Sequence, residues 1–157
     1  MRLYLLKRMI NFIIMASIYH SFIINASISQ VYEAISQPGE LDQWWTLASE
    51  GIPEIGAVYT LDFGPEYKWE AVVESMNPNK LFELRMTKAD GDWTGSIVGF
   101  LLNPKDQYAQ VEFYHTGWKE MNEHYKISSY CWAMYLRILK RYLEYGERVP
   151  YEQRLEV

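Results

Sequence analysis

The sequence has little cysteine and little histidine, and each shortage excludes a class of protein. Cys131 is the only cysteine among 157 residues, so an intrachain disulfide is excluded and a reducing compartment is favoured. Three histidines beside one cysteine offer no ligand spacing typical of a zinc site, and we expect no bound metal. We therefore expect a cytoplasmic protein that depends on packing for its stability.

Long apolar runs and basic charge are also scarce. The apolar run over residues 9–16 falls well short of the roughly 20 residues that a membrane-spanning helix needs. The formal net charge is −5 and the isoelectric point is about 5.2, whereas nucleic-acid binding needs a basic surface. We expect no membrane span and no nucleic-acid partner.

The motifs of the common cofactor and catalytic sites are missing too. The chain contains no G-x-G-x-x-G, no P-loop and no G-x-S-x-G element. Asp90 and Asp92 resemble part of a calcium loop, but the rest of that pattern is missing and a hairpin turn fits better. We expect no cofactor and no catalytic residues, which favours a binding protein over an enzyme.

Residues 1–16 differ from the rest of the chain. Arg2, Lys7 and Arg8 precede the apolar run, which loosely matches a signal peptide, but no clear small-residue cleavage site follows. We expect an N-terminal extension over residues 1–16, a single domain over residues 17–146 and a C-terminal tail over residues 147–157.

Aromatic side chains are the feature present in excess. Six Trp, thirteen Tyr and six Phe make up 16% of the residues. In a domain of this size the rings either pack in a core or line a pocket.

The residue pattern predicts six strands. β-branched and aromatic residues favour a strand over residues 18–24. Apolar and polar residues then alternate with the period of a half-buried strand. These further strands are predicted over residues 59–63, 67–74, 82–87, 95–102 and 110–115.

Helices are predicted between the first and second of these strands and after the last one. Ser27 or Ser29 can cap one short helix, and residues 40–45 fit a second. Residues 121–145 contain no glycine or proline and carry an apolar, aromatic stripe, with Gly146 as the C-cap. This element order predicts an α+β fold: a curved antiparallel sheet of about six strands wrapped around a long C-terminal helix, with two short helices after the first strand.

His115 is the most informative titratable residue. In the predicted strand it lies on the same face as Val111 and Phe113, because side chains two residues apart point to the same side. We expect this face to be directed toward the long helix. His115 is either a hydrogen-bonded residue that fixes the strand end or a polar anchor in an apolar pocket. A sheet curled around one helix rarely fills completely, so we expect a partial cavity between them. The predicted lining is Trp45, Tyr59, Trp69, Met86, Phe100, Phe113, His115, Trp132 and Tyr135.

Several short segments resemble one known superfamily. The segments 113–118 (FYHTGW), 31–35 (VYEAI) and 41–45 (LDQWW), together with Cys131 and Trp132, are similar to the SRPBCC (START-like) superfamily. The chain most resembles its bacterial branch similar to the C-terminal domain of the activator of the Hsp90 ATPase. The resemblance covers about residues 17–146. It implies the helix-grip fold, whose members commonly hold an apolar ligand between sheet and long helix.

The resemblance and the aromatic inward faces predict non-enzymatic binding of a small apolar or aromatic molecule between sheet and helix. Two alternatives stay open. One is a cyclase or hydrolase that uses the same cavity, with His115, Tyr135 or Ser128 as acid–base groups. The other is a co-chaperone-like interaction module. The chain shows no counterpart of the eukaryotic activator's second domain, so an Hsp90-like chaperone is not an expected partner. A homodimer through an exposed sheet edge stays open.

Overall fold

An edge strand begins the described part of the molecule. The computed structural model describes residues 15–156. Its elements are β1 (Ala16–Ile24), α2 (Ile28–Ser36), α3 (Pro38–Leu41), β2 (Ala48–Glu50), β3 (Val58–Asp62), β4 (Lys68–Asn77), β5 (Leu81–Lys88), β6 (Ile97–Pro104), β7 (Ala109–Trp118), α4 (Glu123–Tyr145) and the 3₁₀ helix η1 (Tyr151–Glu156). The predicted N-terminal extension lies outside the described residues up to residue 14, and Ala16 already belongs to β1.

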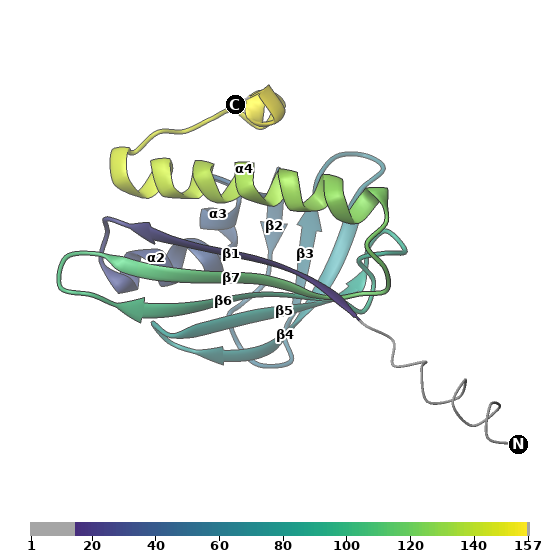
Figure 1. Ribbon diagram of the computed structural model, residues 1–157, viewed down its shortest axis with the longest axis horizontal. Helices are drawn as coiled ribbons and strands as arrows, with labels where there is room; N and C mark the ends of the chain where they lie inside the picture. Colours follow the sequence, from purple (N-terminus) through teal and green to yellow (C-terminus); the bar gives the residue numbers. More distant parts are fainter. Residues whose placement is uncertain (1–14, 157) are drawn as a thin grey trace, which may run out of the picture.

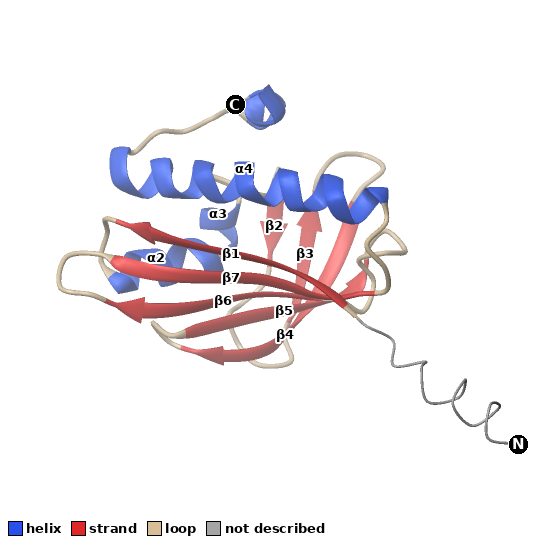
Figure 2. Cartoon of the chain, in the orientation of Figure 1, coloured by secondary structure: helices blue, strands red, loops and turns tan. Residues whose placement is uncertain are grey.

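The strands form one antiparallel sheet, and α4 runs across one face of it (Figures 1 and 2). The strand order is β1-β7-β6-β5-β4-β3-β2, so β1 and β2 are the edges. α2 contacts β5, β6 and α4 and thereby closes part of the layer between sheet and helix. The predicted α+β fold, with an antiparallel sheet against a long C-terminal helix and short helices after the first strand, is confirmed.

The core lies between the sheet and α4, and residue alternation explains which side chains enter it. On β7, Val111, Phe113 and His115 are buried, whereas the residues between them are half-buried. On α4, the predicted stripe places Trp132 and Leu139 in the core. Burying a large apolar side chain contributes about 1.5–3 kcal/mol, so these two inward faces hold the layers together.

Helix α4 begins and ends at recognisable caps. The Asn122 side chain accepts a hydrogen bond from the Tyr125 N–H at 2.9 Å, which starts the helix at Glu123 and not at residue 121. Gly146 adopts a left-handed φ of 66°, as the predicted C-cap requires. No helix within residues 15–156 is both long and apolar enough to cross a membrane.

Two short elements differ from the prediction. β2 pairs with β3 and raises the strand count to seven; three residues are too few to show alternation. α3 covers Pro38–Leu41 and not residues 40–45, because proline fits the first turn of a helix. The N–H groups of Trp44 and Trp45 both bond to the Leu41 carbonyl, so the chain turns there.

The predicted C-terminal tail packs on the domain. Arg154 is only 4% exposed, and its guanidinium donates to the carbonyl oxygens of Asp42 at 2.7 Å and Thr46 at 3.0 Å. The Tyr151 hydroxyl donates to the Phe63 carbonyl at 2.9 Å. η1 therefore fastens the end of the chain to the segment that follows α3 and to the end of β3.

Candidate functional site

Aromatic rings from the sheet, from the loops and from α4 meet beneath the helix. The centroid of the Trp132 ring lies 4.5 Å from that of Phe113, 5.2 Å from that of Trp45 and 5.7 Å from that of Trp93. Such contacts contribute about 0.5–1.5 kcal/mol each beyond area burial. We call this group the ring cluster. Its members are Trp45, Phe63, Trp69, Trp93, Phe113, His115, Trp118 and Trp132.

His115 is the polar centre of the ring cluster. Its Nδ1 accepts a hydrogen bond from the Trp132 indole N–H at 3.1 Å. Since an indole nitrogen can only donate, Nδ1 carries no proton and the neutral ring is protonated on Nε2. Nε2 then donates to the Ser96 hydroxyl at 2.7 Å, which itself donates to the Trp93 carbonyl at 2.6 Å. The network satisfies both ring nitrogens.

The environment of His115 keeps this ring neutral. Burial, reinforced by the nearby His124, lowers the pKa of His115 to about 3. A neutral ring whose two nitrogens are both hydrogen-bonded is a poor proton carrier near neutral pH. The geometry thus supports the structural interpretation of His115 and weakens an acid–base role for it.

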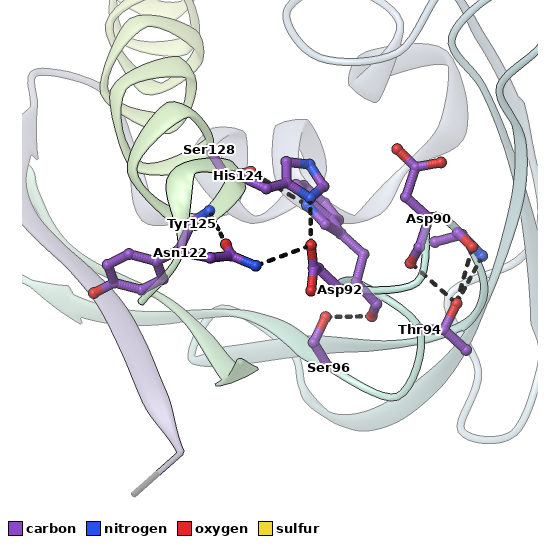
Figure 3. Close-up of polar contacts among 10 residues, drawn as sticks. Asp90, Asp92, Thr94, Ser96, Asn122, His124, Tyr125 and Ser128 are labelled. Carbon is purple, nitrogen blue, oxygen red and sulfur yellow. Dashed lines mark hydrogen bonds and ion pairs between the residues drawn. The ribbon is translucent and has the colours of Figure 1, made fainter. Parts of the chain in front are cut away.

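The loop between β5 and β6 brings Trp93 into the ring cluster. Figure 3 shows the polar contacts that Asp92, in the same loop, makes with Asn122 and His124. The Asp92 carboxylate accepts hydrogen bonds from His124 Nδ1 at 2.9 Å and from the Asn122 amide at 3.4 Å, which tie the loop to the start of α4. Hydrogen bonding from His124 lowers the pKa of the Asp92 carboxyl. The Trp93 indole N–H donates to the Ser128 hydroxyl at 3.3 Å. The sequence carries no signal for Trp93, since a loop residue follows no periodic pattern.

The structure brings some of the residues predicted to line the cavity together and separates others. The ring cluster contains Trp45, Trp69, Phe113, His115 and Trp132. Phe100 adjoins it, with its centroid 5.2 Å from that of Phe113. These rings are packed against one another.

The remaining predicted residues lie elsewhere in the core or beside it. The Tyr59 hydroxyl donates to the Ser36 carbonyl at 2.6 Å, at the end of α2. Met86 is completely buried in β5. Tyr135 is half-buried at the η1 side of α4, and burial, reinforced by Tyr151 and Cys131 nearby, raises its pKa to about 12.

An open groove runs between β1 and α4, beside the ring cluster. Its volume is about 600 Å³. We call it the β1–α4 groove. It is lined by His20, Ser21, Phe22, Ile23, Ala133, Leu136, Arg137, Lys140, Arg141, Glu144 and Tyr145. A second groove of about 460 Å³ lies on the other side of Ala133 and Arg137, toward Met134 and Val149.

One wall residue connects the β1–α4 groove to the ring cluster. The His20 ring stacks on Phe113 with centroids 6.0 Å apart. The His20 Nε2 atom is buried and has no hydrogen-bond partner within residues 15–156. A buried polar atom without a partner costs about 1–3 kcal/mol.

Side chains of α4 hold the helix beside the edge strand. The Tyr125 hydroxyl donates to the Ser17 carbonyl at 2.8 Å. Farther along the helix, the Lys140 ammonium donates to the Ile23 carbonyl at 2.6 Å and to Glu144 at 2.7 Å. These bonds also occupy two carbonyl groups of β1. Because β1 is an edge strand, these carbonyls would otherwise be free to pair with another chain.

The sequence did not reveal the β1–α4 groove. Arg137, Lys140 and Arg141 fall on the polar side of the α4 pattern, which is usually a solvated face. The pattern assigns a face to each residue, but it does not show which strand comes to lie beside that face. Residues 15–156 contain no group of three or more His, Cys, Asp or Glu side chains suited to a metal ion.

A family model and several solved structures match the chain. The model for "Activator of Hsp90 ATPase homolog 1-like protein" matches residues 25–144. The Aha1 dimer from Colwellia psychrerythraea superimposes with a TM-score of 0.77 at 27% identity, covering 85% of this chain and 99% of that one. The search of curated proteins found no match.

Two further solved structures share the fold. A protein from Mesorhizobium loti gives a TM-score of 0.72 at 17% identity, over 84% of this chain and 99% of its own. A protein from Staphylococcus saprophyticus gives 0.71 at 18% identity, over 86% and 96%.

Proposed function

The chain belongs to the Activator of Hsp90 ATPase homolog 1-like protein family, and on that premise we propose that it binds a small hydrophobic or aromatic molecule between its sheet and α4 without catalysing a reaction. The β1–α4 groove is the observation that carries the proposal. Its volume of about 600 Å³ falls within the usual range of small-molecule sites.

The walls of the groove support an apolar ligand. Phe22, Ile23, Ala133 and Leu136 offer aromatic and aliphatic surface from both the strand and the helix. The polar residue Ser21 also lines the groove, and a few polar groups in an apolar wall are typical of ligand sites.

The residues predicted from the sequence have a supporting role in this proposal. Phe113 packs directly behind His20, and Trp132 packs on Phe113. The ring cluster therefore forms a rigid back wall, and a rigid wall lowers the entropy cost of binding. A cyclase or hydrolase is not proposed, because both ring nitrogens of His115 are already hydrogen-bonded.

Filling the β1–α4 groove is expected to abolish binding of an apolar probe. Ala133 is exposed on α4 and lines the groove, so Ala133→Trp occupies it without disturbing the core. Fluorescence titration with N-phenylnaphthylamine, a neutral apolar dye, should show saturable binding to the wild-type protein. The affinity of Ala133→Trp should be lower by at least about tenfold.

Met134→Trp is the matched control, because Met134 lines only the second groove. It should bind the dye as the wild type does. A wild-type protein that does not bind the dye, or an Ala133→Trp variant that binds it normally, contradicts the proposal.

We also propose that the chain forms a homodimer. The Colwellia protein is a dimer, and in this chain Ile127 and Tyr130 leave 53% and 78% of their surface exposed on the outer side of α4. Light scattering coupled to size-exclusion chromatography should give twice the chain mass of 18.6 kDa. A mass equal to one chain at all concentrations tested contradicts it.

A further inference from the structure

Resting on the proposed function, we propose that the molecule held in the β1–α4 groove is an amphipathic monoanion, such as a medium-chain carboxylate, whose acid group binds between Arg137 and Lys140. The apolar part of such a ligand lies along Phe22 and Leu136. Three features of the groove support this class of ligand: its charge, its free donors and the order of its walls.

The charges around the groove leave one positive charge uncompensated. Lys140 pairs with Glu144 at 2.7 Å, and Arg141 pairs with Glu147 at 2.5 Å. Arg137 forms no ion pair within the described part of the chain. A single uncompensated guanidinium is complementary to a ligand with one negative charge.

The hydrogen-bond donors point to the same headgroup. An ammonium has three donors, and Lys140 uses two of them on the Ile23 carbonyl and on Glu144. The guanidinium of Arg137 donates no hydrogen bond within residues 15–156, so all of its donors remain available. A planar guanidinium binds a carboxylate through two parallel hydrogen bonds, and the third Lys140 donor can complete the site.

The order of the walls matches an amphipathic molecule. Leu136 and Arg137 are adjacent on α4, and Lys140 lies one turn farther on, so that these side chains pass from apolar to cationic along the helix. The Lys140 ammonium at 2.7 Å compensates the charge of Glu144, whose carboxylate also accepts a hydrogen bond from the Asn25 N–H at 2.8 Å. The groove thus offers an apolar stretch that ends in positive charge.

The test compares an acid with an alcohol of the same chain length. Decanoate and decanol each displace N-phenylnaphthylamine from the full-length protein near neutral pH, and their affinities are read from the loss of dye fluorescence. Decanoate should bind about tenfold more tightly than decanol. Added salt should weaken decanoate binding and leave decanol binding unchanged, since salt screens a partly exposed ion pair.

A variant of Arg137 tests whether this residue causes the preference for decanoate over decanol. Arg137→Gln should lower the ratio of decanoate affinity to decanol affinity about tenfold, so that the two ligands bind equally well. Arg148→Gln, an exposed arginine outside the groove, should change neither affinity.

The outcomes separate the two proposals. Equal affinity for decanoate and decanol, with both lost in Ala133→Trp, overturns the monoanion proposal and leaves the proposed function standing. A preference for decanoate that survives Arg137→Gln also overturns it. Failure of the wild-type protein to bind the dye, decanol and decanoate overturns both.

Discussion

Replacing Trp132 with alanine is expected to lower the free energy of unfolding by about 4 kcal/mol, the typical cost of removing a large buried ring. Trp132 is 1% exposed and contacts rings from the sheet and from both neighbouring loops. Its loss leaves a cavity at the centre of the ring cluster and also removes the donor to His115. Urea unfolding followed by far-ultraviolet circular dichroism measures the change.

Two companion variants separate packing from hydrogen bonding. Trp132→Phe keeps much of the ring but leaves His115 Nδ1 without its donor, which should cost about 1–3 kcal/mol. Tyr130→Ala removes a ring that is 78% exposed on the same helix, and its effect should stay within about 0.5 kcal/mol. A Trp132→Ala variant as stable as Tyr130→Ala would show that the ring cluster does not join the two layers.

Acidification is expected to destabilise the protein through His115. Burial lowers the pKa of His115 to about 3 in the folded state, whereas an unfolded chain has a histidine pKa of about 6.5. Above about pH 6.5 the ring is neutral in both states and contributes no pH dependence. Between the two values only the unfolded chain binds the proton, so stability falls by about 1.4 kcal/mol for each pH unit lost.

His115→Gln is the control for this titration. A glutamine can accept from Trp132 and donate to Ser96, yet it does not ionise. Acid also removes the stability contributed by carboxyls with lowered pKa, such as Asp92, but this loss is common to both proteins. The wild type should therefore lose about 2.3 kcal/mol more than His115→Gln between about pH 6.5 and pH 4.5. Parallel pH profiles from urea unfolding would contradict the neutral, buried state of His115.

Most of the fold could be predicted because it depends on residue periods. Alternation on β7 and the stripe on α4 identify inward side chains such as Phe113 and Trp132, and the layers follow from burying those faces. Elements too short to show a period could not be predicted in this way. β2 was missed, and the helix predicted over residues 40–45 begins instead at Pro38. The buried Arg154 was missed as well, because two of the carbonyls that it binds lie more than a hundred residues away in the chain.

The candidate site was harder to predict than the fold. The sequence shows that Trp45, Phe113 and His115 face inward, but packing decides whether inward rings surround space or fill it. The β1–α4 groove arises where an edge strand and the polar side of a helix come side by side, as with Phe22 and Arg137. Neither segment alone carries a signal for it.

The most direct test of the proposed ligand site is to map decanoate binding by amide chemical shifts on the isotope-labelled full-length protein. Saturable shifts should concentrate on residues 20–23 of β1 and residues 133–145 of α4, the two walls of the groove, and these shifts should be lost in Ala133→Trp. Shifts confined to other surfaces, or no saturable shifts at all, would contradict the claim that this groove is a ligand site.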